Sequence, residues 1–157
     1  MIQKHISIDY LEYGRPEEMN AEDRELVAEA VAAMDNAYAP YSHFHVGAAV
    51  RMSNGQIVRG SNQENAAFPS GLCAERTAMF AASARYPDKD MRSLAVAGGV
   101  YGRLVKEPCT PCGACRQVMA QYQAKAAKPM SVILVGADRI WKFEKVDDIL
   151  PFIFDSI

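Results

Sequence analysis

The order of apolar and polar positions changes its period several times along the chain. From Asn20 onward the apolar residues recur at helical spacing, which predicts a helix that Asn20 caps and Pro40 ends. The runs 45–52 and 56–62 then favour β-strands, and Asn54-Gly55 between them predicts a tight hairpin turn because both residues tolerate positive φ. The predicted helix has one apolar stripe, formed by Leu26, Val27, Ala30, Val31 and Met34.

The second half of the chain alternates between helical and strand-like segments. A short strand with Ile6, Ile8 and Tyr10 on one face is predicted before the first helix, and a terminal helix or turn, with Asp147 as its cap, is predicted at the end. Strands that alternate with helices indicate a layered α/β domain. Helical patterns cover residues 72–85 and 111–125, and strand-like patterns cover residues 94–100, 130–136 and 139–146.

The composition is typical of one globular domain. The chain has 157 residues, 50% of them apolar and 23% charged, with a net charge of −2. We expect residues 1–19 to form an N-terminal extension and residues 20–157 to form a single catalytic domain. The charge indicates neither a nucleic-acid nor a membrane partner, and no apolar run approaches the roughly 20 residues of a membrane span. The N-terminus has no apolar secretion core, so we expect a cytoplasmic protein.

The cysteines are concentrated in two segments. Three of the four follow one another at Cys-x-x-Cys-x-x-Cys spacing, and Cys73 lies elsewhere. In a reducing compartment such cysteines are typical of metal-binding or catalytic sites rather than of disulfides. Cys73 and Cys112 stand where helices are predicted to begin, and helix N-termini lower the pKa of a thiol. Since Cys115 shares a helix face with Cys112, three thiolates around an open fourth position describe a catalytic zinc site.

Three charged residues lie beside these cysteines. Glu75 follows Cys73 by two positions and therefore does not share its helix face, so it can reach past the thiol without binding metal itself. A carboxylate in this place can take a proton from metal-activated water and deliver it to a substrate. Arg76 and Arg116 each adjoin a predicted ligand, and their guanidinium groups could offset the negative charge of a three-thiolate zinc site.

Two motifs together match the signature of zinc deaminases. They are Cys73-Ala74-Glu75 and Pro111-Cys112-Gly113-Ala114-Cys115, in which a cysteine replaces the signature's histidine. The stretches AYAPYSHFHVGAAV, GSNQENAAFPSGLCAERTAMF, PCGACRQVM and LPFIF extend the match over about residues 22–154. The chain therefore resembles the small cytidine deaminases of the three-cysteine type. The resemblance implies a three-layer α/β/α fold, with a mixed sheet and helices on both faces.

The resemblance also implies a reaction. Cys73, Cys112 and Cys115 would bind one Zn²⁺ per chain, and Glu75 would move protons. Hydroxide activated by the zinc would attack C4 of the cytosine ring of cytidine or deoxycytidine. Loss of ammonia would then leave uridine or deoxyuridine, a step of pyrimidine salvage.

Substrate contacts are implied for further residues. Asn62 and Glu64 would hold the sugar hydroxyls, and Phe44 would line the pocket. The backbone N–H of Ala74 would face the carbonyl oxygen of the base, and Phe154 would stack on the base in a neighbouring subunit's site. A shared site implies an oligomer, and the family's short members are homotetramers.

The chain departs from the family's usual pattern at several places. His45 stands where proline is usual, Phe68 where tyrosine is usual, and Gln63 where a small apolar residue is usual. The N-terminal residues also extend beyond the family's usual start. None of these departures touches the predicted metal ligands or Glu75, so they bear on substrate preference more than on reaction type.

Other functions are compatible with parts of the pattern. A deaminase of another aminopyrimidine nucleoside, such as blasticidin S, would share the metal motif. A non-enzymatic zinc or iron–sulfur module would use Cys109 as a fourth ligand, whereas the deaminase leaves Cys109 as a small buried apolar side chain. A nucleic-acid-editing deaminase is disfavoured by the acidic charge balance and by the sugar-binding pair Asn62 and Glu64.

Overall fold

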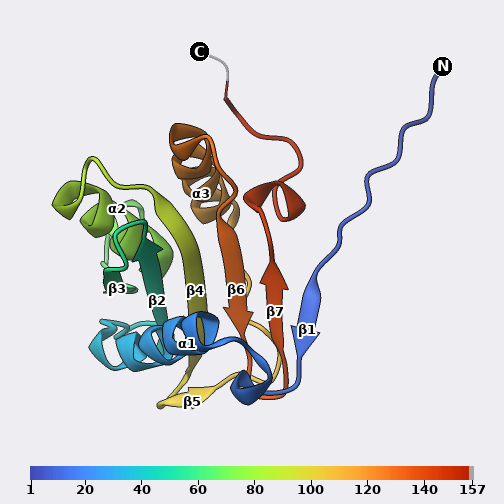
Figure 1. The fold of residues 1–157 in the computed structure, drawn as a ribbon. Coiled ribbons are helices and arrows are strands. Elements are labelled where there is room, and N and C mark those ends of the chain that lie inside the picture. Colours follow the sequence, from blue (N-terminus) through green and yellow to red (C-terminus); the bar gives the residue numbers. More distant parts are fainter. Residues whose placement is uncertain (156–157) are drawn as a thin grey trace.

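A seven-stranded mixed sheet forms the centre of the computed structural model, which describes residues 1–155 (Figure 1). The order across the sheet is β1-β7-β6-β4-β2-β3, and β5 pairs with the end of β4. The β4–β6 pair is parallel, and the other pairs are antiparallel. The strands are β1 (Leu11–Tyr13), β2 (Phe44–Met52), β3 (Ile57–Ser61), β4 (Met91–Val100), β5 (Arg103–Leu104), β6 (Ser131–Val135) and β7 (Ile140–Phe143).

Three α-helices cover the two faces of this sheet. They are α1 (Ala21–Ala33), α2 (Ala74–Arg85) and α3 (Gly113–Ala126). As predicted, Asn20 caps α1, because its side-chain Oδ1 accepts a hydrogen bond from the Asp23 N–H at 2.8 Å. Four short 3₁₀ segments complete the regular structure of the described residues: Pro16–Glu18, Met34–Asn36, Phe68–Ser70 and Val146–Asp148.

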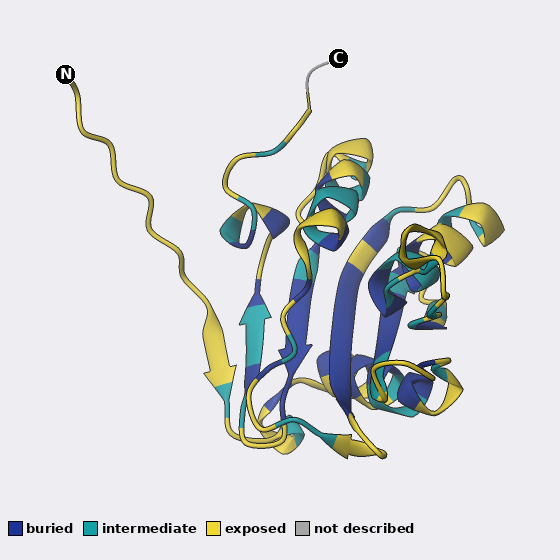
Figure 2. Ribbon diagram, turned by 180° about the vertical axis from the view of Figure 1, so that it is seen from behind, coloured by how far each residue is buried: buried dark blue, intermediate teal, exposed yellow. Residues whose placement is uncertain are grey.

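The core consists of two apolar clusters, one on each face of the sheet. The cluster under α1 contains Ala49 and Ala95, whereas their chain neighbours Val50 and Leu94 belong to the cluster under α2 and α3. This alternation follows from the period of two along a strand, and both faces of the central strands are buried (Figure 2). The predicted three-layer α/β/α architecture with a mixed sheet is confirmed.

The parallel pair defines one end of the sheet. Helix α3 connects β4 to β6, so it begins near the carboxyl end of β4 and returns along the sheet. Helix α2 ends shortly before β4 begins, so its N-terminus also lies toward the carboxyl end of β4. Open α/β sheets bind ligands in the crevice at this end of their strands. The fold therefore brings the beginnings of α2 and α3 to one place.

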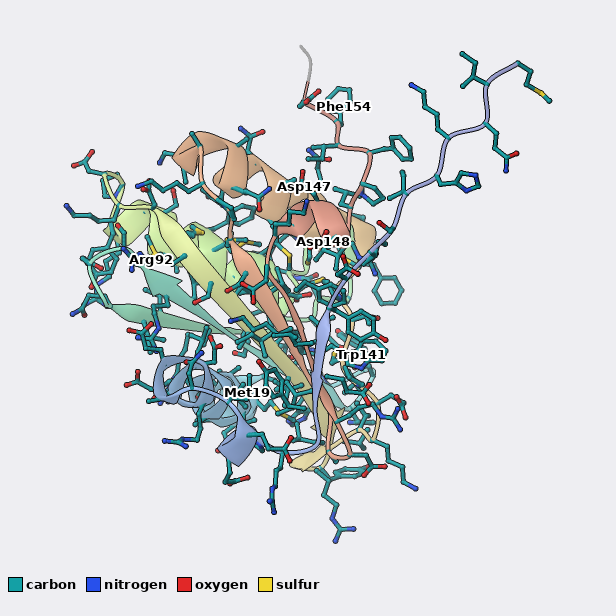
Figure 3. All side chains as sticks on the ribbon, turned by 45° about the vertical axis from the view of Figure 1, so that its right-hand side comes forward. Met19, Arg92, Trp141, Asp147, Asp148 and Phe154 are labelled. Carbon is teal, nitrogen blue, oxygen red and sulfur yellow. The ribbon has the colours of Figure 1, made fainter. Side chains whose placement is uncertain are left out.

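The predicted strand at Ile6–Tyr10 is wrong, because residues 1–10 are exposed and contain no regular secondary structure. The strand forms instead at β1, where Leu11 pairs with Lys142 of β7. Available pairing partners thus decide where this segment becomes a strand. Residues of the predicted extension take part in the fold, since β1 joins the sheet and Met19 is buried in the cluster under α1 (Figure 3).

Two local predictions also differ from the structure. The β2–β3 hairpin has a three-residue loop with Gly55 alone at positive φ (+82°), the pattern of a turn followed by a left-handed residue. Asp147 does not cap the short 3₁₀ segment, because it lies inside that segment and Lys145 occupies the cap position. Its carboxylate accepts a hydrogen bond from Gln123 Nε2 at 2.7 Å. None of the described helices has the length and apolar character to cross a bilayer.

Candidate functional site

Three cysteine side chains meet where α2 and α3 begin. The Sγ atoms of Cys73, Cys112 and Cys115 all lie within 4.8 Å of one another, and those of Cys73 and Cys112 are 3.9 Å apart. Cys73 is the N-cap residue of α2, Cys112 is that of α3, and Cys115 lies in the first turn of α3. The fold thus brings together three thiols that stand far apart in the sequence.

Both helix ends are left open toward these sulfur atoms. Neither Cys73 nor Cys112 makes a side-chain capping hydrogen bond. The helical bonds begin with Thr77 N–H donating to the Cys73 carbonyl and Arg116 N–H donating to the Cys112 carbonyl, both at 3.0 Å. The N–H groups that precede these donors have no acceptor within their own helix. Two positive helix ends therefore favour negative charge on the sulfur atoms.

The pKa values of the clustered thiols are shifted in opposite directions. Hydrogen bonding from Cys115 and from Arg76 lowers the pKa of Cys73 to about 5, although partial burial opposes this shift. The same hydrogen bond to Cys73, together with burial, raises the pKa of Cys115 above its usual range. Arg76 Nη2 lies 3.7 Å from Cys73 Sγ. The lowered pKa and the neighbouring Arg76 guanidinium both favour a thiolate at Cys73.

The geometry of the three sulfur atoms fits zinc. Two thiolates bound to one zinc at about 2.3 Å with tetrahedral angles lie about 3.8 Å apart, and the Cys73–Cys112 separation is 3.9 Å. Three sulfur donors leave one position of a tetrahedral ion open. This donor set suits a catalytic zinc, whose fourth position takes water or substrate, rather than a closed structural one.

Cys109 is not a member of this thiol cluster. Burial, with a contribution from the charge of Glu75, raises the pKa of Cys109 to about 11. Its thiol lies against Gly98 of β4, which the Phe44 ring also approaches: a Cβ on Gly98 would stand 2.7 Å from Cys109 Sγ and 3.0 Å from Phe44 Cε1. Cys109 is therefore a partly buried thiol whose neutral form is favoured, and the structure supports no closed four-cysteine site among the described residues.

Glu75 lies in the first turn of α2, directly after the buried Ala74. Only 4% of its surface is exposed. This burial is the main reason that the pKa of its carboxyl group is raised above the usual value, and the negative charge of Cys73 adds to the effect. A buried carboxyl beside a metal site with a raised pKa is suited to accept and return a proton near neutral pH.

The two arginines adjoining the ligands have different contacts. Arg76 contacts the Cys73 thiol, as described above. Arg116 instead donates from Nε to the Pro111 carbonyl and from Nη1 to the Ile149 carbonyl, each at 2.9 Å. Arg116 thus ties the segment after β7 to the beginning of α3. The predicted charge balance is supported by a direct contact at Arg76, whereas at Arg116 it stays a prediction.

The residues predicted to contact the sugar lie where β2 begins and β3 ends. The Asn62 side chain accepts from the Val46 N–H and donates to the Phe44 carbonyl, each at 2.8 Å, so it is tied to the backbone of β2. The Glu64 carboxylate accepts from the N–H groups of Tyr41 and Ser42, at 2.9 Å and 3.2 Å. Asn62, Glu64 and the half-buried Phe44 are therefore parts of one hydrogen-bonded unit.

Ser42 belongs to this unit and was not predicted from the sequence. Its hydroxyl donates to Glu64 Oε1 and accepts from the Phe44 N–H at 3.0 Å. The Ser42 hydrogen bond is the largest cause that lowers the pKa of Glu64, so it favours the ionised form of this carboxyl group. A serine one residue before a left-handed residue, His43 (φ +56°), is typical of a turn, but the sequence does not reveal its partner.

The departures from the family pattern lie around the same region. Phe68 is 82% exposed, and His45 is half-buried on β2. The Gln63 side chain donates to the Ser61 hydroxyl at 3.2 Å. None of these residues contacts the thiol cluster through a hydrogen bond that the structure records.

The last predicted contact, Phe154, lies on the C-terminal segment after α3 and β7 (Figure 3). Phe154 is 70% exposed, so the described residues 1–155 leave most of its surface uncovered. The backbone at Phe154 is held by Gln117 of α3, whose Nε2 donates to the Phe154 carbonyl at 2.7 Å and whose Oε1 accepts from the Phe154 N–H at 3.2 Å. The ring thus points into solvent while its backbone is fixed to the helix that holds Cys112 and Cys115.

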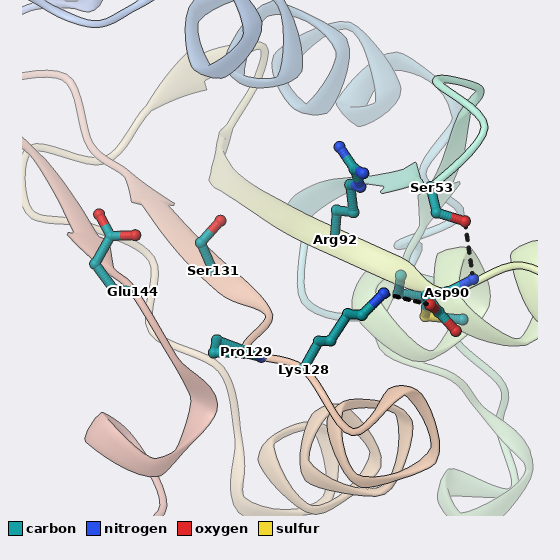
Figure 4. A pocket seen from close by; sticks show the side chains of 8 residues that line it. Ser53, Asp90, Arg92, Lys128, Pro129, Ser131 and Glu144 are labelled. Carbon is teal, nitrogen blue, oxygen red and sulfur yellow. Dashed lines mark hydrogen bonds and ion pairs between the residues drawn. The ribbon is translucent and has the colours of Figure 1, made fainter.

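A polar pocket of about 380 Å³ lies at the opposite end of the parallel strands (Figure 4). Its walls include Arg92 and Lys128, whose charges are matched by Asp90 and Glu144. Lys128 Nζ lies 3.9 Å from Asp90 Oδ2. The pocket contains none of the predicted site residues, and its balanced charges indicate no class of ligand.

Comparisons with known proteins agree with this site. The family model described as "Cytidine and deoxycytidylate deaminase zinc-binding region" matches residues 20–130. The chain is 36% identical over 140 residues to a "Probable cytidine deaminase" of Dictyostelium discoideum, covering 88% of each chain. It is 47% identical over 96 residues to a "Cytidine deaminase" of Halalkalibacterium halodurans, covering 61% of this chain and 68% of the relative.

Solved structures give the same result. A crystal structure of cytidine deaminase from Burkholderia pseudomallei superposes with a TM-score of 0.69 at 37% identity, covering 87% of this chain and 100% of the other. A crystal structure of cytidine deaminase from Mycobacterium tuberculosis superposes with a TM-score of 0.68 at 29% identity, with the same coverage.

Proposed function

Since this chain belongs to the cytidine and deoxycytidylate deaminase family, whose reaction is zinc-dependent deamination, we propose that it hydrolyses free cytidine, deoxycytidine or both. The products are uridine or deoxyuridine and ammonia, so the enzyme serves pyrimidine salvage. The observation that carries this proposal is the cluster of three thiols at two open helix ends, with the buried carboxyl of Glu75 beside it.

Each residue of the cluster has a chemical task. Cys73, Cys112 and Cys115 hold the zinc. The bound zinc supplies a water of lowered pKa at neutral pH. Glu75 takes a proton from this water and gives it to N3 of the cytosine ring. The water oxygen bonds to C4, and Glu75 takes the second proton of this oxygen and passes it to the amine at C4. The C4–N4 bond then breaks, the C4 carbonyl forms and ammonia leaves. Arg76, which contacts Cys73, offsets the charge of the thiolates.

The unit formed by Phe44, Asn62 and Glu64 binds the nucleoside. Asn62 and Glu64 keep unused hydrogen-bonding capacity for sugar hydroxyls, since a side-chain amide has two donors and a carboxylate has about four acceptor positions. Phe44 supplies an apolar wall for the base. The N–H of Ala74, in the open first turn of α2, donates to the carbonyl oxygen of the base.

The active form is a homotetramer with sites shared between subunits, in which Phe154 stacks on the base in a neighbouring site. One observation supports this: the Phe154 ring is exposed while its backbone is fixed. Light scattering tests it: a tetramer has four times the chain mass of 17.3 kDa.

We place the enzyme in the cytoplasm. All four cysteines are free thiols, and three of them must stay reduced to bind zinc. A reducing compartment meets this requirement.

One experiment on purified protein tests reaction and cofactor together. The loss of cytidine ultraviolet absorbance is followed, and zinc is measured on the same sample. We expect turnover with about one zinc per chain. Parallel assays with deoxycytidine and blasticidin S identify the substrate. Zinc without turnover of cytidine or deoxycytidine would contradict the proposed substrate, and turnover of blasticidin S alone would replace it.

A further inference from the structure

A hydrogen-bond network joins the loop before β2 to the residues after β3. Its central member is Ser42, whose hydroxyl donates to Glu64 Oε1 and accepts from the Phe44 N–H at 3.0 Å. Glu64 and Phe44 are two of the residues that we propose contact the substrate. One hydroxyl therefore links the carboxylate that faces the sugar to the aromatic residue that faces the base.

The surroundings of Glu64 leave little freedom to its carboxylate. The N–H groups of Tyr41 and Ser42 both donate to Oε2, and the Ser42 hydroxyl donates to Oε1. An ionised carboxylate has about four acceptor positions, and three of them are taken by this short turn. The remaining position lies on Oε1, the oxygen that the Ser42 hydroxyl fixes.

Asn62 is fixed on the other side of the same unit. Its amide oxygen accepts from the Val46 N–H, and its amide nitrogen donates to the Phe44 carbonyl. One N–H of its amide group stays available. Phe44 is thus held through its N–H by Ser42 and through its carbonyl by Asn62, so the orientations of Glu64 and Asn62 depend on the same short piece of backbone.

We propose that Ser42 is a positioning residue for nucleoside binding, which orients the free acceptor of Glu64 so that it and the free N–H of Asn62 meet one sugar hydroxyl. This rests on the proposed function. Ser42 acts through Glu64 and does not itself need to touch the nucleoside. Its loss leaves Glu64 with two backbone donors on Oε2 and an Oε1 that no side chain of the turn holds.

A merely structural hydroxyl in an exposed turn would behave differently. It would affect every substrate to the same degree, whether or not that substrate carries sugar hydroxyls. If Ser42 has a positioning role, its loss lowers kcat/KM only for substrates that carry the sugar hydroxyls. The pair cytidine and 2′,3′-dideoxycytidine separates the two for the ring hydroxyls, because the second nucleoside keeps the base and the 5′-hydroxyl and lacks the 2′- and 3′-hydroxyls.

The test measures kcat and KM of the zinc-loaded enzyme for both nucleosides. For Ser42→Ala we expect kcat/KM on cytidine to fall by about three- to tenfold, as for a lost hydrogen bond to a charged group in an exposed place. The loss appears in KM, and kcat/KM on 2′,3′-dideoxycytidine changes little. Ser42→Thr keeps the hydroxyl and restores most of the value for cytidine.

Matched variants complete the design. Ser53→Ala removes a loop hydroxyl at the opposite end of β2 that accepts from the Asp90 N–H at 3.2 Å, and it leaves the preference for cytidine unchanged. In a double-mutant cycle Ser42→Ala adds little to Glu64→Gln, because both act through the same carboxylate.

Two negative results have different meanings. Equal losses on both nucleosides in Ser42→Ala would show that Ser42 only stabilises the loop, and would overturn this inference while leaving the proposed function intact. A wild-type enzyme that does not distinguish cytidine from 2′,3′-dideoxycytidine would instead contradict the proposed role of Asn62 and Glu64. The two proposals can therefore fail separately.

Discussion

The three α-helices begin in two different ways. The N-terminus of α1 is closed by its own chain: Asn20 accepts from the Asp23 N–H, and the Asp23 carboxylate is paired with Lys142 Nζ at 2.8 Å. The N-termini of α2 and α3 each have a cysteine at the cap position, and neither side chain makes a capping bond. A cysteine is a poor cap, so these two helices lack a stabilising contact that α1 has.

This difference shows which helix N-termini remain available to bind a charged ligand. At α1 the N–H and the carboxylate of Asp23 both have partners within the chain, and this helix end serves stability. At α2 and α3 the N–H groups of the first turn face three sulfur atoms that fit zinc. The sequence alone therefore distinguishes the two kinds of helix start. The structural start, at α1, has Asn at the cap position and an acidic first turn. The functional starts, at α2 and α3, have Cys at the cap position, followed by Glu75 or Cys115.

The most severe test of this comparison converts an open helix start into a closed one. Cys112→Ser provides a better capping residue and removes a zinc ligand, so we expect the protein to lose zinc and turnover to fall below detection. Zinc content and cytidine turnover on the same sample measure this. Cys109→Ser makes the same atomic change outside the thiol cluster and should keep zinc. A Cys112→Ser variant with full zinc would contradict the assignment.

A smaller effect is expected at the two arginines. Arg76→Ala removes the guanidinium beside the Cys73 thiolate, and zinc affinity should fall by about 10- to 100-fold. Arg116→Ala removes two hydrogen bonds to carbonyls, so we expect a loss of about 1–3 kcal/mol in the free energy of unfolding and a smaller change in zinc affinity. Chelator competition and urea unfolding separate the two. Equal losses of zinc affinity would show that Arg116 also balances the charge.

The ion pair between Asp23 and Lys142 at the N-terminus of α1 predicts a loss of stability at high pH. Burial opposes the charge of Lys142, but the hydrogen bond and charge of Asp23 outweigh it, aided by Glu144, and raise the pKa of Lys142 above its usual 10.5. A raised lysine pKa gives stability that is fully present below pH 10.5 and is lost as the pH rises through the raised value. Lys142→Met should therefore cost about 3 kcal/mol near pH 7.

Denaturant unfolding between pH 7 and pH 11 checks this prediction. The stability difference between wild type and Lys142→Met should stay constant up to about pH 10 and then shrink. A difference that already declines between pH 7 and pH 9 would show that the pair is not the source of the stability.

The smallest effect is expected at the cap of α1. Asn20→Ala removes the hydrogen bond to the Asp23 N–H and should lower the free energy of unfolding by about 1 kcal/mol. Zinc content, kcat and KM should not change, because α1 and the thiols of α2 and α3 lie on opposite faces of the sheet. A loss of zinc in this variant would contradict the division into closed and open helix starts.

The parts of the site that could be predicted from the sequence are those with local spacing. Cys112 and Cys115 share one helical turn, and the Cys-Ala-Glu motif places Glu75 in the first turn of another helix. The cap at Asn20 could be predicted for the same reason. In each case the chemistry depends on residues that are two or three positions apart. Cys73 and Cys112 lie 39 positions apart, and their meeting could be predicted because the deaminase signature contains both.

The parts that could not be predicted are contacts between distant segments that no motif connects. Ser42 donates a hydrogen bond to Glu64, which lies 22 positions later in the chain, and Arg116 donates to the Ile149 carbonyl, 33 positions later. The position of β1 depends on pairing with β7, whereas the apolar alternation at Ile6, Ile8 and Tyr10 suggests a strand earlier in the chain. Residue type and spacing do not contain this information, because the partner is chosen by the tertiary fold.

The most direct test of the account is to measure zinc content and cytidine turnover in Glu75→Gln. Glu75 lies beside the three thiols and is not one of them, so the variant should keep the wild-type amount of zinc. Turnover should fall by about 10²- to 10⁴-fold, the usual contribution of a positioned acid–base group. A variant that binds zinc and deaminates cytidine at the wild-type rate would contradict the assigned proton transfer.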